Sequence, residues 1–156
     1  MIAVSDTSPL NYLILIELQD LLPELFDRVL IPEAVDRELR SPAAPDAIKR
    51  FLAESPTWLE AQSVGETEPA LTLLDSGERE VIALALAMKP DAVLLDERQG
   101  RRAARERGLP VSGTLGLLRS AADRGLVQLT DALDRLEATN FRATARLFET
   151  IRSDMR

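Results

Sequence analysis

Short apolar runs rich in β-branched residues recur along the chain, and longer runs with apolar residues at helical spacing separate them. The short runs predict strands over residues 2–5, 28–31, 92–95 and 109–112, with a weaker one within 58–64. The longer runs predict helices over residues 9–18, 20–26, 32–40, 46–54, 69–74, 79–88 and 114–124, an Arg-rich helix after Asp96, and a helical tail.

Strands that alternate with helices indicate βαβ units. We therefore expect an α/β fold of three layers, α/β/α, in which helices cover both faces of a central, mainly parallel sheet of four to five strands. The length of 156 residues suits a single domain spanning residues 1–156.

Two helix starts carry local signals. Ser8 before Pro9 predicts an N-cap with proline at the first helical position. Asp75 and Glu78, three residues apart before an apolar helix, have the form of a capping box.

The composition excludes several kinds of chemistry. The chain has no Cys and no His, so disulfides, thiolate and imidazole metal sites, and catalysis by Ser-His-Asp or Cys-His groups are all ruled out. A metal ion must then be held by oxygen ligands, which favours Mg²⁺ or Mn²⁺. No apolar run is long enough to span a bilayer and no secretory signal is visible, so we expect a cytoplasmic protein without a membrane segment.

The formal charge of −7 argues mildly against nucleic-acid binding. However, all but Lys49 and Lys89 of the 19 basic residues are Arg, whose planar fork matches phosphate oxygens. The net charge therefore does not decide between nucleic acid and other partners.

Four carboxylates are candidates for one site at the carboxyl edge of the sheet. Asp6 and Asp96 each follow a strand, Glu38 borders the apolar face of a helix, and Glu78 lies where the next apolar helix begins. Four acids gathered without compensation repel one another, so such a cluster implies bound divalent cations.

Each acid also has a structural interpretation. Asp6 can be a loop acid at the positive end of a helix, Glu38 a surface carboxylate, and Glu78 a capping residue. Asp96 can be the N-cap of the Arg-rich helix, a role for which Glu97 competes.

Five stretches together resemble the PIN-domain nucleases, and in particular the branch close to the VapC-type toxins of toxin-antitoxin pairs. They are "VSDTSPLNYL", "VLIPEAVDREL", "LDSGEREVIALALA", "VLLDERQGRRAARERGLPV" and "SGTLGLL". They occur in the order found in that family and cover most of the chain, from Ala3 to about Asp131.

The resemblance implies a PIN-like fold and a metal-dependent endoribonuclease that cleaves single-stranded RNA and leaves 5′-phosphate and 3′-hydroxyl ends. Asp6, Glu38, Glu78 and Asp96 match the four acids that hold one or two Mg²⁺ or Mn²⁺ ions in the family. The third acid is usually Asp in the toxins, whereas here it is Glu78. Ser8 matches a small polar residue that supports the site, and the branch implies a small antitoxin partner and a homodimer.

The Arg-rich helix permits two interpretations. Arg98, Arg101 and Arg102 can bind the phosphates of single-stranded or structured RNA near the acids. Alternatively the helix is a solvated surface with Glu97–Arg101 and Arg102–Glu106 pairs, an interpretation that we favour for Arg105 and Arg107.

Two other functions stay open at this stage. Receiver domains and aspartate-based phosphatases also place acids at parallel strand ends, but they resemble the chain less, because no second Asp stands two residues after Asp6. The other alternative is a catalytically weak or inactive PIN-like scaffold that binds a protein partner or RNA.

Overall fold

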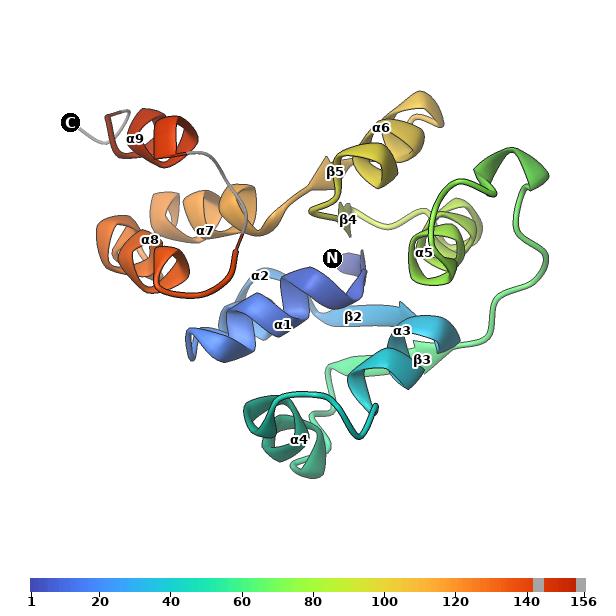
Figure 1. Cartoon of the computed structure of the whole chain (residues 1–156), viewed down its shortest axis with the longest axis horizontal. Helices are drawn as coiled ribbons and strands as arrows, with labels where there is room; N and C mark the ends of the chain where they lie inside the picture. The colour runs from blue at the N-terminus through green and yellow to red at the C-terminus, as the bar shows by residue number, and fades with distance from the viewer. Residues whose placement is uncertain (142–144, 154–156) are drawn as a thin grey trace.

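Five parallel strands form one sheet in the computed structural model, which describes residues 1–141 and 145–153 (Figure 1). The strands are β1 (Ile2–Ser5), β2 (Arg28–Pro32), β3 (Leu59–Gln62), β4 (Ala92–Leu94) and β5 (Val111–Ser112). The helices are α1 (Thr7–Leu15), α2 (Leu21–Leu25), α3 (Glu33–Leu39), α4 (Asp46–Ala53), the 3₁₀ turn η1 (Pro69–Leu71), α5 (Ser76–Met88), α6 (Arg98–Glu106), α7 (Thr114–Asp123), α8 (Leu129–Glu137) and α9 (Ala145–Ser153).

The strand order is β3-β2-β1-β4-β5, with every neighbouring pair parallel. The three central strands carry side chains that are completely buried on both faces, as parallel strands under two helical layers require. These residues are Ala3, Val4, Val29, Leu30, Val93 and Leu94. The expected three-layer α/β/α architecture with a mainly parallel sheet is therefore confirmed.

The helices group on the two faces of the sheet. Helix α1 packs against α4 and α7, whereas α5 packs against α6. In Figure 1, α8 and α9 lie beyond α7, at the opposite end of the view from α5. No helix in the described part of the chain is long and apolar enough to cross a membrane.

The strand register aligns the carboxyl ends of the central strands. Ser5 of β1 pairs with Leu94 of β4, which in turn pairs with Ser112 of β5. The Asp6 amide donates to the Leu94 carbonyl at 3.0 Å, and the Leu95 amide donates to the Ser112 carbonyl at 3.0 Å. Helices α1, α3, α6 and α7 consequently begin at one edge of the sheet, where polar residues that follow the strands meet.

The expected start and end of the first helix are wrong by a few residues. Asp6, in an extended conformation, occupies the N-cap position, so Ser8 lies in the first turn instead of capping it. Pro9 is tolerated there because amides of the first turn have no partner within the helix. The helix stops at Leu15 because Glu17 adopts a φ of 61° and the Leu18 amide donates to the Leu13 carbonyl, the closure typical of a Schellman motif.

The capping box at the start of α5 is confirmed. The Glu78 amide donates to Asp75 Oδ1 at 2.7 Å, and the Asp75 amide donates to Glu78 Oε1 at 3.4 Å. The short helix expected over residues 69–74 is the 3₁₀ turn over Pro69–Leu71. These features fix the N-terminus of α5 at the carboxyl edge of the sheet.

Candidate functional site

Asp6 lies at the centre of the carboxyl edge. It follows β1 directly, is only 6% exposed, and makes no side-chain capping hydrogen bond to α1 although it occupies the N-cap position. Burial raises its pKa from an ordinary value of 3.8 to about 7, the Thr7 amide offsets part of this rise, and Asp75, Glu38 and Asp96 add to it. Helix capping therefore does not account for Asp6, because its carboxylate makes no side-chain capping bond and the Thr7 amide offsets only part of the effect of burial on its pKa.

Asp75 is the acid that raises the pKa of Asp6 most among its charged neighbours. A Cβ placed on Gly77 would stand 3.2 Å from Asp6 Oδ1 and 3.4 Å from Asp75 Oδ1. Glycine at this position therefore allows the two carboxylates to approach from β1 and from the start of α5. The sequence pattern around Asp75 indicates only a capping residue.

Glu78 combines two roles. Its Oε1 closes the capping box, whereas its Oε2 is buried without a hydrogen-bond partner in the described structure. Helix α6 comes so close here that a Cβ on Gly100 would lie 2.3 Å from Glu78 Oε2. Burial and the neighbouring Asp75 raise the pKa of Glu78 to about 7. An unsatisfied buried carboxylate oxygen is costly unless a proton or a cation compensates it.

Glu38 reaches the same edge from α3. Its side chain is exposed, and its Oε2 accepts a hydrogen bond of 2.8 Å from the Thr7 hydroxyl in the first turn of α1. This bond holds the carboxylate beside Asp6, where its charge raises the pKa of Asp6. Glu38 is thus a surface carboxylate, the structural role considered for it above, but it lies next to the site.

Asp96 is fixed by the start of the next helix along the sheet. Its Oδ1 accepts from the Thr114 amide and its Oδ2 from the Thr114 hydroxyl, both at 2.7 Å. Burial raises the pKa of Asp96, and the two bonds from Thr114 together with the charge of Arg101 oppose that rise. The interpretation of Asp96 as N-cap of the Arg-rich helix is wrong, because Glu97 takes that position in α6 while Asp96 accepts a bond from the first amide of α7.

Gly113 allows Arg101 to approach Asp96. A Cβ on Gly113 would stand 2.3 Å from Arg101 Nη1 and 3.0 Å from Asp96 Oδ1. Arg101 donates from Nη1 to the Leu95 carbonyl at 3.1 Å, so the expected Glu97–Arg101 pair gives way to a bond with the end of β4. Any side chain at position 113 would displace the guanidinium or the carboxylate.

The acids surround the ends of β1 and β4 without converging on one point. In the part of the chain that the structure describes, no three acidic side chains stand close enough together to hold one ion. The donor chemistry nevertheless fits Mg²⁺ or Mn²⁺, since carboxylates are the hard ligands these ions prefer. Asp6 is buried among like charges and Glu78 Oε2 lacks a partner, and a cation would satisfy both.

The arginines of α6 fall into two groups. Arg98, Arg101 and Arg105 line a cleft of about 490 Å³ that also includes Asp96. Arg102 lies outside that cleft, with its side chain 81% exposed, and pairs with Glu106 at 3.1 Å, as the surface interpretation of the helix expected. Arg105, for which we favoured the surface interpretation, instead lines the cleft.

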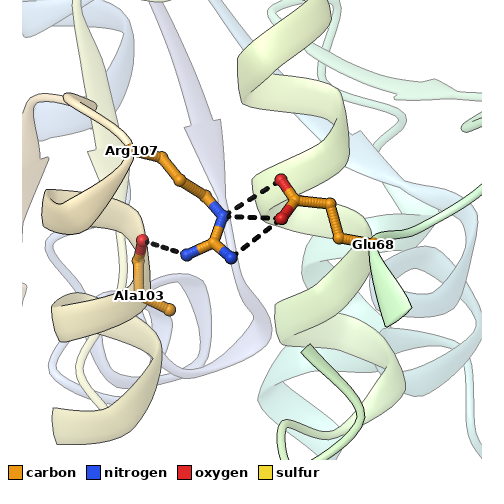
Figure 2. A network of polar contacts seen from close by, with 3 residues as sticks. All are labelled: Glu68, Ala103 and Arg107. Atoms are coloured by element: carbon orange, nitrogen blue, oxygen red, sulfur yellow. Dashed lines mark hydrogen bonds and ion pairs between the residues drawn. The ribbon is translucent and has the colours of Figure 1, made fainter. Parts of the chain in front are cut away.

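Arg107 fastens the end of α6 to the segment before α5 (Figure 2). Its Nε donates to Glu68 Oε1 at 3.0 Å, its Nη2 to Glu68 Oε2 at 2.8 Å, and its Nη1 to the Ala103 carbonyl at 2.9 Å. Arg107 therefore has a structural role that connects the helix of the arginines to the loop that leads to Asp75.

Ser8 is half-buried in the first turn of α1, two residues after Asp6, and its supporting role stays a prediction. Thr114 and the position of Asp75 beside Asp6 were not predicted from the sequence. A signal for Thr114 was present, because the polar run Ser112-Gly113-Thr114 follows a strand that ends at the same sheet edge as Asp6. Asp75 carried a comparable signal, because its capping box already placed it at the start of the helix that holds Glu78.

Comparison with known proteins identifies the family of this chain. Residues 2–156 match the model of a family described as a PIN domain, DUF3368. Among solved structures, the chain is similar to a PilT N-terminus domain protein from the hyperthermophilic archaeon Sulfolobus solfataricus P2, with a TM-score of 0.55 and 18% identity over 78% of this chain and 93% of that one. At this identity the likeness supports the fold alone. No curated protein matches the chain. Because the family match includes all five strands and all four predicted acids, the chain belongs to the PIN-domain family, whose members are generally nucleases.

Proposed function

We propose that this protein is a metal-dependent endoribonuclease that hydrolyses phosphodiester bonds of single-stranded RNA. The observation that carries the proposal is Asp6, a carboxylate that is 6% exposed at the end of a central strand, makes no side-chain cap and lies among other acids. A group in these surroundings needs a proton or a cation. PIN domains typically use divalent metals, which fits this requirement.

Asp6, Glu38, Glu78 and Asp96 are the residues that would hold Mg²⁺ or Mn²⁺, and Asp75 is positioned to join them. When bound, such an ion lowers the pKa of water and offsets the charge of the scissile phosphate. The chain's own contribution is to orient the acids: the Thr7 hydroxyl fixes Glu38, and Thr114 fixes both oxygens of Asp96. Both supports are needed because ligands must be held in place before they can form a site.

Three arginines of α6 lie in the same cleft as Asp96. Arg98, Arg101 and Arg105 border the cleft that contains Asp96, and their charges offset those of the acids and of RNA phosphates. That Arg98 and Arg101 line this cleft with Asp96 supports the phosphate-binding role proposed for them, whereas Arg102 pairs with Glu106 outside the cleft.

The biological context that we propose rests on the resemblance to VapC-type toxins. In that context the protein is the toxin of a toxin-antitoxin pair, forms a homodimer, and is inhibited by a small antitoxin. Co-expression with the product of a small neighbouring gene tests this part separately. A stable complex that suppresses RNA cleavage supports it, and the absence of any such partner removes the toxin role but leaves the nuclease in place.

Cleavage of labelled RNA tests the central activity. Purified protein is incubated with single-stranded and structured RNAs in Mg²⁺, Mn²⁺ or EDTA, beside the variants Asp96→Asn and Asp123→Asn. Asp123 is an exposed acid at the end of α7, outside the candidate site, and serves as the matched control. We expect cleavage that requires metal, leaves 5′-phosphate ends, persists in Asp123→Asn and disappears in Asp96→Asn.

Two results would overturn the proposal. Cleavage that survives both EDTA and the Asp96 substitution would exclude the metal mechanism. Failure to cleave any RNA, combined with no Mn²⁺ binding, would favour the alternative of an inactive PIN-like scaffold that binds a protein partner or RNA.

A further inference from the structure

The cleft beside Asp96 has two chemically different walls. One wall is basic and consists of Arg98, Arg101 and Arg105 from α6. Within the described ranges neither Arg98 nor Arg105 forms an ion pair with a carboxylate, whereas Arg102, Arg107 and Arg152 all do. Both side chains are exposed, so their charges are available to an anion that enters the cleft.

The second wall is apolar. Leu115 of α7, Phe141 and Ile151 of α9 line it. The Phe141 ring meets Tyr12 edge-on, with ring centroids 4.9 Å apart, and also contacts Phe148 at 6.3 Å. These contacts hold the aromatic side chain in position, which lowers the entropic cost of using it as a binding surface.

Helix α9 keeps this apolar wall in place. Arg152 donates to Glu137 at 2.6 Å and to Asp134 at 2.8 Å, and so fastens α9 to α8. Ser112, Gly113 and Gly116 complete the lining, and Arg101 and Asp96 occupy the space beside Gly113. The cleft volume of about 490 Å³ lies within the range of roughly 300–1,000 Å³ that is typical of small-molecule sites.

We infer that this cleft is a nucleotide subsite for single-stranded RNA, next to the bond that is cut. One unpaired base packs against Phe141, Leu115 and Ile151, while Arg98 and Arg105 bind the phosphates on either side of it. Arg101, held by the Leu95 carbonyl, lines this subsite together with Asp96. The inference rests on the proposed nuclease function and adds where the substrate is gripped and why it must be single-stranded.

The combination of walls favours RNA over an acidic protein segment. An unpaired nucleotide presents a flat apolar face and phosphate groups about one nucleotide apart, which match one aromatic wall and one row of guanidinium groups. A base that is paired in a duplex is stacked between its neighbours and cannot enter such a cleft. The subsite therefore predicts a preference for unpaired nucleotides.

Binding without cleavage tests the inference. The affinity of a short fluorescein-labelled single-stranded RNA is measured by fluorescence anisotropy in EDTA at several salt concentrations. The proteins are the wild type, Arg105→Ala, Phe141→Leu and the matched control Arg102→Ala, which removes an arginine of the same helix that lies outside the cleft. Thermal unfolding of each variant verifies that it is folded.

The two walls give different expected results. Arg105→Ala weakens binding and reduces the slope of log affinity against log salt by about one, because one phosphate contact is lost. Phe141→Leu weakens binding by about fivefold or more with an unchanged slope, because a stacking surface is lost and no charge is removed. Arg102→Ala and an RNA duplex serve as references: the former binds like the wild type, and the latter binds more weakly than the single strand.

The outcomes also separate this inference from the proposed function. If Arg105→Ala and Phe141→Leu bind like the wild type, or Arg102→Ala weakens binding equally, the subsite is wrong even where metal-dependent cleavage persists. If the wild type neither binds nor cleaves RNA, the subsite and the nuclease function are both overturned. Retained cleavage with no measurable wild-type binding would overturn the subsite alone.

Discussion

Thr114 is the residue on which the position of Asp96 depends. Its hydroxyl and amide satisfy the two oxygens of a half-buried carboxylate, and Thr114 itself is fully buried. Replacing it by Val keeps the volume and the amide but removes the hydroxyl, so one carboxylate oxygen loses its partner. We expect Thr114→Val to lower the free energy of unfolding by about 1–3 kcal/mol and to reduce RNA cleavage.

Urea unfolding and cleavage assays measure this effect, with Thr114→Ser as the control because it keeps the hydroxyl. A serine variant that loses activity as completely as the valine variant would show that the methyl packing, and not the bond to Asp96, is what matters.

The buried acids also make stability depend on pH. Asp6 and Glu78 have pKa values of about 7 in the folded protein, above their ordinary values of 3.8 and 4.5. Between those limits the folded state binds more protons than the unfolded state, so stability falls as the pH rises from about 4 to 7. We expect the free energy of unfolding of the metal-free protein to fall by on the order of a few kcal/mol over this window. The melting temperature should decrease accordingly.

Asp6→Asn is expected to remove much of this pH dependence, since the amide does not titrate. Scanning calorimetry in EDTA across the window provides the measurement. A melting temperature that rises between pH 4 and 7 would contradict the raised pKa values, and added Mn²⁺ is expected to restore stability at the upper end.

Helices α5 and α6 pack together and carry residues of the site. Helix α5 supplies Glu78, and α6 supplies the three arginines that line the cleft. They meet where Gly100 lies against Glu78, and Arg107 connects the end of α6 to Glu68 in the segment before α5 (Figure 2). This ion pair is partly exposed, so its loss should affect local order more than global stability.

We expect Arg107→Ala to increase amide hydrogen exchange in the segment from Glu68 to Leu74 while the melting temperature changes little. Hydrogen exchange followed by mass spectrometry measures this, and Arg102→Ala removes the exposed Arg102–Glu106 pair as a comparison. Equal exchange in both variants would mean that the Glu68 contact does not order the loop.

The architecture of the whole molecule was largely predictable, because its signals are local or periodic. Continuous apolar runs such as Ala92–Leu94 indicate strands that are buried on both faces, and helices between them require a parallel sheet. The predicted ends of helices were less accurate where contacts between distant parts of the chain determine them. Ser8 looks like an N-cap in sequence, but the register of β1 against β4 places Asp6 there instead.

The site was predictable in outline and not in its contacts. Strand ends predicted that Asp6 and Asp96 share an edge, because that depends only on the sheet being parallel. The bond from Thr114 to Asp96 joins residues 18 apart in the chain and depends on the pairing of β4 with β5. The burial of Glu78 Oε2 against Gly100 likewise depends on how α5 packs on α6, which no sequence pattern encodes.

Calorimetric titration of the metal-free protein with Mn²⁺ measures whether the acids around Asp6 hold a divalent cation. The titration is run at a pH of about 8, above the pKa of about 7 for Asp6, on the wild type, Asp6→Asn and Asp123→Asn. We expect the wild type and Asp123→Asn to bind Mn²⁺ equally and Asp6→Asn to lose at least about tenfold in affinity. Absence of binding by the wild type, or unchanged affinity in Asp6→Asn, would contradict this expectation.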